Sequence, residues 1–503
     1  MKIGAECNKK WICWGYVFFG FLLTSCGGWL SLSPIQTPID PLPYILVTNA
    51  PYATPSPTPL KPAPVTPTPV PPILPTYTAT ITPTATLTPI PSSTVIIDFS
   101  ALIPKPGPLP EFRIPSFAPP PSPVLGDYET VNFLLIGSDE RFGSSFRTDT
   151  LVIVVLRPKD QQVTLISIPR DLWVYIPDWD MQRINTAYQH GELTNYPSGG
   201  PGLLKHTILY NLGIRIDHTA MVDFNGFRLI VDTLEGVNVP IACPYTDWHL
   251  IDPSLDPNDE GNWELYTVNP GVVHMDGDLA LWYARSRKRS SDFDRGRRQQ
   301  EVLRALHASA LHTDALEKLP QLYQDLNNTV TTDLNLTDLL QLAIFAPRMT
   351  NADIRSYYIR PPLVTSWITP LGAYVLLPER LALQTMIQEA LMVSDQVIER
   401  KKIIVEIQNG TINDGWDAAA ASRLNYAGYE TRIMSEVKKD YVQSLLIDMT
   451  REQRPDQADS LLTFLGLPHD SLVSMADPDS SVDYRLILGI DYQPCFDPTI
   501  YVP

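Results

Sequence analysis

The chain has 503 residues, with 38 Lys and Arg against 55 Asp and Glu, 49 Pro and 5 Cys. At roughly 150 residues per domain this length predicts two or three domains, and the apolar residues are sufficient for a sizeable core. The formal net charge of −17 argues against a general nucleic-acid binder, which needs a basic face to neutralise phosphates. The five cysteines form no CxxC pair or Cys/His cluster, which argues against a structural zinc site.

The N-terminal residues predict an export signal. Three lysines precede the uncharged apolar run 11–23, an order typical of secretory signals. The run is shorter than the ~20 residues of a membrane span, and residues 23–26 read Leu-Thr-Ser-Cys, which resembles a bacterial lipobox. We therefore predict a lipoprotein-type signal over 1–26 with lipid on Cys26; an uncleaved signal anchor is the alternative. Both place the rest of the chain outside the cytoplasm, anchored to the outer face of the cytoplasmic membrane.

Residues 27–127 are rich in proline and threonine. Of the 49 prolines in the chain, 27 fall between residues 31 and 125. Such a segment cannot bury a core, and each proline lacks an amide donor. We predict an extended linker, in which residues 31–125 have an upper reach on the order of 290 Å at ~3.1 Å per residue. This length suits a tether for a domain that works in a wall above a membrane; a mere spacer is the alternative.

Residues 128–395 alternate between short apolar runs and helical spacing. The expected strands are 131–137, 151–156, 163–168, 220–224 and 237–241. The expected helices are 203–212, 227–234, 279–284, 302–311 (with Arg304 exposed), 336–345 and 378–391. Strands and helices mixed in this order predict an α/β domain, a three-layer sandwich of helices around a mixed central sheet.

A second, small α/β domain is predicted over 402–495. Residues 399–402 are all charged and mark a boundary. Strands are expected at 403–407, 429–434 and 484–490, with a helix at 418–424. In a lipoprotein only Cys243 and Cys495 would remain after the signal is removed, and each could stay free.

Charged residues gather near the ends of the predicted strands in the first domain. From Arg285 to Arg298 there are seven Lys or Arg in fourteen positions, although the chain is acidic overall. Arginine forks match phosphate oxygens bidentately, and nearby aspartates suit Mg²⁺, which binds through few carboxylates plus phosphate oxygens. On a helix Arg295, Arg298 and Gln299 would share one face. These observations favour a phosphate-rich ligand; solvated charges and surface ion pairs are the alternative.

The first domain resembles the LytR–CpsA–Psr family in the sequence and the order of its motifs. These motifs are FLLIGSDER (133–141), RTDT (147–150), LISIPRD (165–171), INTAY (184–188), VDFNGF (222–227), LEGV (234–237) and the block 285–299. The second domain, with VEIQNGT (405–411) and LGIDY (488–492), resembles the LytR C-terminal domain. One departure is Glu235, which stands where family members commonly have the first of two glycines.

The resemblance implies a chemistry and a site. Family members move a glycopolymer from a polyprenyl pyrophosphate carrier onto a cell-wall hydroxyl, usually of peptidoglycan. By motif position, Mg²⁺ (or Mn²⁺) is held by Asp139 and Asp149. The residues expected in catalysis are Arg141, Arg170, Asp171, Arg287, Asp292 and Arg295, with Asp171 or Asp292 as the general base. Gln299, Arg285 and Arg298 are expected to assist in binding the substrate.

The lipid tail of such a carrier needs an apolar tunnel. We expect this tunnel to be lined by the helix 203–212 and by Phe224, Phe227, Leu229, Ile230 and Leu234; ordinary core packing is the alternative. Two other functions are alternatives. One is a hydrolase, which would use the same arginines and metal to transfer the phosphoryl group to water. The other is a non-enzymatic wall tether, in which the linker and the second domain do the binding. A transcription regulator is argued against by the predicted export and by the net charge of −17.

Overall fold

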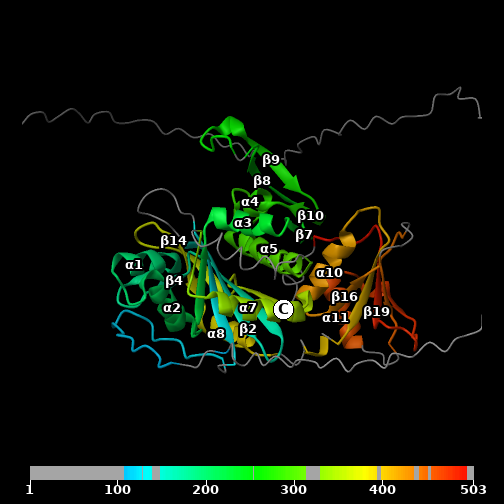
Figure 1. Ribbon diagram of the computed structural model, residues 1–503. Coiled ribbons are helices and arrows are strands. Elements are labelled where there is room, and N and C mark those ends of the chain that lie inside the picture. Colours follow the sequence, from blue (N-terminus) through cyan, green and yellow to red (C-terminus); the bar gives the residue numbers. More distant parts are fainter. Residues whose placement is uncertain are drawn as a thin grey trace, which may run out of the picture. The chain divides into compact units, whose positions relative to one another are not determined.

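The computed structural model of the chain is shown in Figure 1. It describes residues 103, 107–126, 129–138, 148–252, 254–312, 329–393, 398–400, 402–434, 441–450 and 455–495. The predicted signal with Cys26 and most of the linker lie outside the described residues, as do Asp139 and Arg141. Within the described ranges, no helix has both the length and the apolar character needed to cross a membrane.

A six-stranded mixed sheet forms the centre of the first domain, in the order β11-β6-β1-β2-β3-β12. Its strands are β1 (Val131–Ser138), β2 (Thr148–Arg157), β3 (Gln162–Ile168), β6 (His218–Val222), β11 (Val330–Thr332) and β12 (Ile354–Tyr358). The strands β1, β2 and β3 are antiparallel neighbours, whereas β6 and β12 run parallel to β1 and β3. The turn at residues 158–161 joins β2 to β3, as its sequence predicts.

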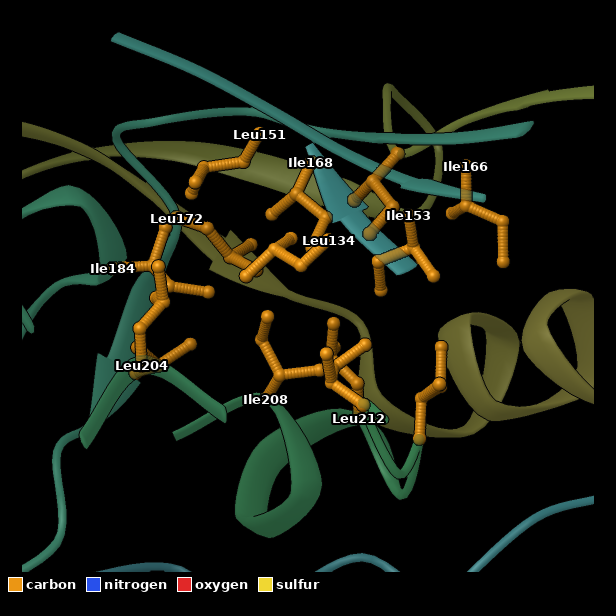
Figure 2. Packing of buried hydrophobic residues seen from close by; sticks show 14 of the residues in the cluster. Leu134, Leu151, Ile153, Ile166, Ile168, Leu172, Ile184, Leu204, Ile208 and Leu212 are labelled. Atoms are coloured by element: carbon orange, nitrogen blue, oxygen red, sulfur yellow. The ribbon is translucent and has the colours of Figure 1, made fainter. Parts of the chain in front are cut away.

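Side chains alternate between the two faces of this sheet, and both faces are covered. Leu134 and Ile153 point into a core shared with helices α2 (Gly199–Leu212) and α8 (Arg380–Leu391), shown in Figure 2. Val131 and Phe133 belong to a core on the other face, which includes residues of α7 (Leu336–Phe345) and is joined by Leu303 of α5 (Asp292–His312). The predicted three-layer α/β sandwich with a mixed central sheet is confirmed.

The connections between these strands hold elements that the sequence patterns do not single out. Expected helices appear as α3 (Phe224–Thr233) and α4 (Gly277–Arg285), and an expected strand as β7 (Val237–Ile241). Not predicted are β4 (Trp173–Tyr175), β5 (Met181–Arg183), α1 (Ala187–Leu193), β8 (Tyr245–Leu250), β9 (Trp263–Val268), β10 (Gly271–Met275), β13 (Val364–Ile368) and β14 (Tyr374–Pro378). The predicted strand 220–224 ends early: the Asp223 carboxylate accepts from the Gly226 amide and caps α3, so Phe224 is helical.

The second domain has its own five-stranded sheet, in the order β16-β15-β19-β17-β18. Its elements are β15 (Ile404–Asn409), α10 (Trp416–Tyr426), β16 (Glu430–Ile433), β17 (Leu445–Asp448), α11 (Pro455–Leu465), β18 (Leu472–Ser474) and β19 (Tyr484–Leu488). Helices α10 and α11 contribute Leu424 and Leu461 to a core that is separate from those of the first domain.

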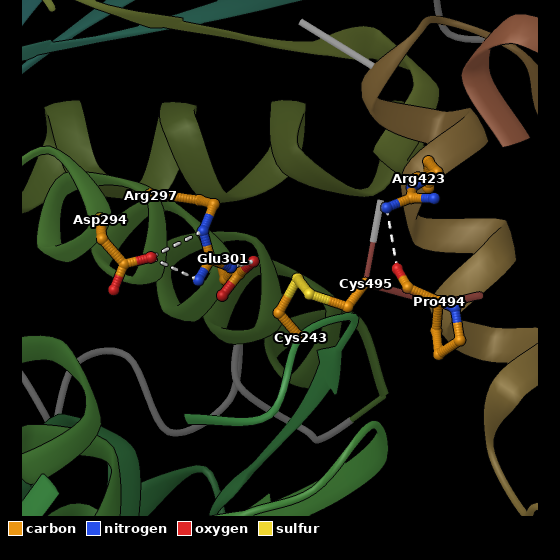
Figure 3. Close-up of a disulfide and its surroundings, with 7 residues drawn as sticks. All are labelled: Cys243, Asp294, Arg297, Glu301, Arg423, Pro494 and Cys495. Carbon is orange, nitrogen blue, oxygen red and sulfur yellow. Dashed lines mark hydrogen bonds and ion pairs between the residues drawn. A yellow bond between two sulfur atoms is a disulfide. The ribbon is translucent and has the colours of Figure 1, made fainter. Parts of the chain in front are cut away.

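The second domain packs against the first through α10, which contacts β7, β10 and β12. The two cysteines, which the sequence allows to remain free, form the disulfide Cys243–Cys495 between the end of β7 and the segment after β19 (Figure 3). Arg304 was expected to be exposed, but it is buried. Its guanidinium carbon lies 3.8 Å from the centroid of the Tyr426 ring at the end of α10. Helix α5 therefore packs against the second domain.

The turn before β7 contains a strained residue. Glu235 has φ 61° and Gly236 has φ 87°, so a residue with a Cβ stands in the left-handed region. This conformation costs a non-glycine residue roughly 1–2 kcal/mol. A glycine there avoids that cost, but its greater freedom in the unfolded chain offsets about 0.5–1 kcal/mol of the stability gained. We expect Glu235→Gly to raise the free energy of unfolding by up to about 1 kcal/mol in thermal melts. Glu235→Ala, which keeps the Cβ, should give no such gain; equal effects of both variants would refute the strain.

Candidate active site

The antiparallel pairing of β2 and β3 brings two motifs together. Leu151 pairs with Ile168, so the start of β2, with Asp149, lies beside the end of β3, where Arg170 follows. Polar residues at strand ends can converge in this way because the strands supply a fixed register. The first turn of α5, which begins at Asp292, completes the site. These elements line a small hollow with Asp149, Thr150, Arg170, Asp292, Arg295 and Gln299 among its residues.

Arg170 is the centre of the charged cluster. Its Nη1 donates to Asp149 Oδ1 at 2.7 Å, and its Nε lies 3.5 Å from Asp171 Oδ2 and 3.7 Å from Asp292 Oδ2. Burial lowers the pKa of Arg170, but the hydrogen bond with Asp149 and the three carboxylate charges outweigh burial, so the net shift is upward. Arg170 is therefore held in one orientation as a permanent cation.

Asp292 connects three arginines at the hollow. Its Oδ1 lies 3.1 Å from Arg287 Nη1 and 3.4 Å from Arg295 Nη1, and its Oδ2 faces Arg170. Arg295 is 8% exposed and also donates to the Asp149 carbonyl oxygen at 3.4 Å. Burial, together with the nearby charges of Arg170 and Arg287, lowers the pKa of Arg295, although Asp292 opposes this shift. Cations crowded in this way favour an added anion such as a phosphate.

The amide of Gln299 also belongs to the hollow. Its Nε2 donates to Thr150 Oγ1 at 2.8 Å and to the Ala284 carbonyl oxygen at 3.1 Å. Gln299 follows Arg295 by four residues on α5, so both side chains lie on the face that meets the sheet. Two of the three residues that were predicted to share one face of α5, Arg295 and Gln299, therefore do so.

Arg298 is the third member, and the structure does not bring it to the hollow. Its side chain is fully buried and turns toward α4, where its guanidinium donates to the carbonyl oxygens of Tyr283 and Ser286. Its Nε lies 3.1 Å from Asp294 Oδ2. All of these partners are internal, so Arg298 holds the end of α4 against α5.

Three other predicted substrate contacts also lie apart from the residues that line the hollow. The guanidinium carbon of Arg285 lies 4.4 Å from the centroid of the Phe224 ring. Phe227 packs against a core formed by α3, β7 and α4. In the predicted tunnel helix, Leu203, Leu204, Ile208 and Leu212 belong to the sheet core. Core packing, the alternative reading, therefore applies to these leucines and to Phe227.

Comparison with known proteins decides the family. The model of the LytR_cpsA_psr family matches residues 120–390, more than half of the chain. The chain belongs to the LytR–CpsA–Psr family. The polyisoprenyl-teichoic acid–peptidoglycan teichoic acid transferase TagU of Oceanobacillus iheyensis is 32% identical over 216 residues, which are 42% of this chain and 62% of TagU. The probable cell wall biosynthesis protein LcpB of Corynebacterium glutamicum is 31% identical over 228 residues, 42% of this chain and 50% of LcpB.

The chain therefore spans less than two thirds of the length of these two relatives. Among solved structures, B. subtilis TagV is similar with a TM-score of 0.42 and 25% identity, over 52% of this chain and 97% of TagV. B. subtilis TagT has a TM-score of 0.39 and 24% identity, over 52% of this chain and 89% of TagT.

Two residues that support the family's charged site were not predicted. Arg183 in β5 places its Nε 3.3 Å from Asp171 Oδ1, which fixes that carboxylate beside Arg170. Gln300 is fully buried and donates to Ser167 Oγ at 2.8 Å, which ties α5 to the end of β3. Arg183 carries no local signal, because β5 is three residues long. Gln300, which follows Gln299, could have been found from the helical pattern, because it is a polar residue on the buried face of an amphipathic helix.

The family implies a Mg²⁺ ion at this site, and the described residues fit it in part. Asp149 Oδ1 accepts from Arg170, and the 30% exposure of the side chain leaves its other oxygen open to a ligand. A magnesium ion needs only one or two carboxylates when phosphate oxygens and waters complete its shell. The described residues form no cluster of three or more metal-binding side chains. The second predicted ligand, Asp139, lies outside them.

A second cavity lies between α2 and the edge of the sheet. Its volume is about 430 Å³, and its lining combines apolar residues such as Ile136 and Met221 with Lys205, His206 and Asp333. Lys205 Nζ donates to Asp333 Oδ2 at 2.8 Å. Lys205 and His206 come from the predicted tunnel helix 203–212, whereas Phe224 and Phe227 do not line this cavity, which is mixed in polarity.

Proposed function

We propose that the chain transfers a glycopolymer from a polyprenyl pyrophosphate carrier to a hydroxyl of peptidoglycan. The observation that carries the proposal is the convergence of Arg170, Arg287 and Arg295 on Asp292, which lines the hollow together with Arg170 and Arg295. Three guanidinium groups at one point suit a diphosphate. The similarity to TagU, a polyisoprenyl-teichoic acid–peptidoglycan teichoic acid transferase, supports the same chemistry.

The proposed reaction is one phosphoryl transfer. The oxygen of the acceptor hydroxyl attacks the phosphorus that bears the sugar, the bond from that phosphorus to the bridging oxygen breaks, and polyprenyl phosphate leaves. Arg170 and Arg295 stabilise charge on the non-bridging oxygens. Asp292 lines the hollow and takes the hydroxyl proton, whereas Asp171, which does not line it, orients Arg170. A Mg²⁺ ion, held by Asp149 with Asp139, would neutralise phosphate charge when bound.

The reaction requires the chain to work at the outer face of the membrane. We include in the proposal that Cys26 carries the lipid anchor, since it follows the lipobox-like residues 23–25. Mass spectrometry of the mature N-terminus is expected to find a diacylglyceryl-modified Cys26 as the first residue. An intact chain that still begins at Met1 in the membrane would contradict lipidation and favour the signal anchor. Cys13→Ser serves as the control, since it should leave processing unchanged.

Arginine geometry tests the proposed site. Arg170→Lys and Arg295→Lys keep the charge but lose the planar fork that grips two phosphate oxygens. Losing one charge-assisted hydrogen bond costs roughly 1.5–3 kcal/mol, so transfer should fall about 10- to 150-fold. The measurement is transfer of a labelled polyprenyl-pyrophosphate glycan to peptidoglycan, with folding checked by thermal melting.

Arg432→Lys is the control, because Arg432 lies in the second domain and its side chain is 49% exposed. Its rate should stay unchanged. Near-normal rates in both site variants would contradict bidentate binding of phosphate oxygens by Arg170 and Arg295. Release of free polymer phosphate at the same rate without peptidoglycan would instead identify a hydrolase.

A further inference from the structure

The hairpin formed by β13 and β14 lies outside the hollow and ends in an uncharged tip, residues 368–374. No Asp, Glu, Lys, Arg or His occurs between Arg360 and Glu379. Leu371 in the turn is 97% exposed, and a Cβ placed on Gly372 would meet no atom within 4 Å apart from its neighbours in the chain. The tip therefore projects as a convex apolar surface, which is not the shape of a pocket for a small ligand.

The side chains of the tip are arranged as in segments that lie at a membrane surface. Ile368 stands opposite Tyr374, and both are exposed. The Tyr374 hydroxyl forms a 2.9 Å hydrogen bond with Ser366 Oγ, so its ring leans away from the turn. Trp367 is exposed on the other face of the hairpin. Aliphatic side chains thus lie foremost with amphipathic rings behind them, the order in which such residues enter a bilayer.

The backbone of the turn requires little from water. The Thr369 amide donates to the Ala373 carbonyl oxygen at 2.9 Å, and the Gly372 amide donates to the Thr369 carbonyl oxygen at 2.8 Å. The Ala373 amide donates to Thr369 Oγ1 at 3.0 Å, and Pro370 has no amide to satisfy. Unpaired backbone groups are what excludes most loops from a bilayer. Because this turn satisfies these amides internally, it can leave water at a lower cost than an ordinary loop.

The base of the hairpin is attached to the charged site. The Leu376 amide donates to the Asp171 carbonyl oxygen at 3.0 Å. Arg183 Nε, which lies 3.3 Å from Asp171 Oδ1, also donates to the Tyr374 carbonyl oxygen at 3.2 Å. The residue before Asp171 is Arg170, which lines the hollow. The turn lies about five residues beyond Leu376, or roughly 17 Å along a strand, so the tip and the hollow belong to one rigid part of the first domain.

We infer that the tip of the β13–β14 hairpin inserts into the outer surface of the membrane and docks the charged site there. The inference rests on the proposed function, since the polyprenyl carrier of the proposed donor is a membrane lipid. Apolar side chains can enter the interface without attraction between charges, which a chain of net charge −17 does not offer to an anionic surface. Insertion holds the arginine cluster near the layer of the membrane in which the pyrophosphate group lies.

Depth-dependent quenching tests the insertion without turnover. A fluorescent amino acid replaces Leu371 in the full chain, which is reconstituted on vesicles of neutral phosphatidylcholine. Lipids brominated near the headgroup should quench this label more strongly than lipids brominated near the chain end, because the insertion is shallow. The same label at position 412 is the matched control, since Ile412 in the second domain is 77% exposed, and it should not be quenched. Adding Ile368→Asp should remove the quenching at position 371, because a carboxylate is costly to bring into the bilayer.

Transfer activity gives a second readout. Leu371→Asp should raise KM for a polyprenyl-linked donor in vesicles at least about 10-fold, since it exchanges inserted apolar surface for a charge. Transfer from a short-chain, water-soluble donor should stay unchanged, because Leu371 does not line the hollow. Thermal melting checks that the variant folds.

A label at position 371 that is quenched no more than the label at position 412 would overturn the inference. An equal loss of transfer from both donors in Leu371→Asp would also overturn it, since that result indicates a structural role for the tip. Because quenching needs no donor, it is read in the same way whether or not the chain is a transferase. Failure of the unmodified chain to transfer from either donor would refute the proposed function alone.

Discussion

Replacing Asp149 by asparagine is expected to lower glycopolymer transfer by at least about 100-fold, the scale of losing one well-placed charge stabiliser. The Asp149 carboxylate accepts a hydrogen bond from Arg170 at 2.7 Å, and the main-chain carbonyl oxygen of Asp149 accepts one from Arg295 at 3.4 Å. The asparagine variant keeps the shape and the carbonyl contact but removes the charge that orients Arg170. It also removes the proposed metal ligand, since a neutral amide is a weaker hard ligand than a carboxylate.

The measurement is the rate of labelled transfer over a range of Mg²⁺ concentrations. Asp160→Asn is the control: Asp160 lies in the turn at the far end of the same strand, is 39% exposed, and pairs with Arg157 at 3.7 Å. It should retain the wild-type rate. A wild-type rate for Asp149→Asn at limiting Mg²⁺ would contradict both proposed roles of Asp149.

The three central strands β1, β2 and β3 could be predicted from the sequence because they are buried on both faces. The strands β11 and β12 were not predicted: β11 has only three residues, and three of the five residues of β12 are half-buried. Continuous apolar runs such as 131–136 and 163–168 read directly as buried strands. The short strands β4 and β5 have only three residues each, too few to show a period. The hairpin β8–β9 was missed for another reason. Its strands carry apolar side chains on both faces, mixed with acidic ones, so they show no clean alternation of polar and apolar residues.

The site was predicted better by motif than by periodicity. Strand register explains why Asp149 and Arg170, which are 21 residues apart, meet at 2.7 Å. Helical spacing alone placed Arg298 beside Arg295 and Gln299, but a position three residues from Arg295 and one from Gln299 lies at the border of a helix face. The carbonyl oxygen of Tyr283 in α4 and the ring of Tyr245 in β8 decide which way Arg298 points: its guanidinium carbon lies 3.9 Å from the Tyr245 ring centroid. Such a tertiary choice is not encoded in local spacing.

Loss of the Cys243–Cys495 disulfide is expected to lower the free energy of unfolding by about 2–5 kcal/mol, since a cross-link over a long loop removes much unfolded-state entropy. The two cysteines are 252 residues apart in sequence. They join the end of β7 to the segment after β19, where Arg423 Nη2 also donates to the Pro494 carbonyl oxygen at 2.8 Å. Figure 3 shows this linkage beside α5, whose residues Arg297 and Glu301 form an ion pair.

Thermal and denaturant unfolding of the oxidised chain, the reduced chain and Cys243→Ser/Cys495→Ser would measure the effect. The reduced chain and the double variant should unfold at the same, lower midpoint, and adding reductant should not change the double variant further. Arg304 still packs on Tyr426 without the disulfide, so the second domain should remain folded and the site on α5 should keep its geometry. Transfer activity measured below the lower midpoint should therefore stay within about twofold of wild type, since the disulfide acts mainly on the unfolded state. Equal midpoints for the oxidised and reduced chains, with two free thiols counted only after reduction, would refute the stabilising role.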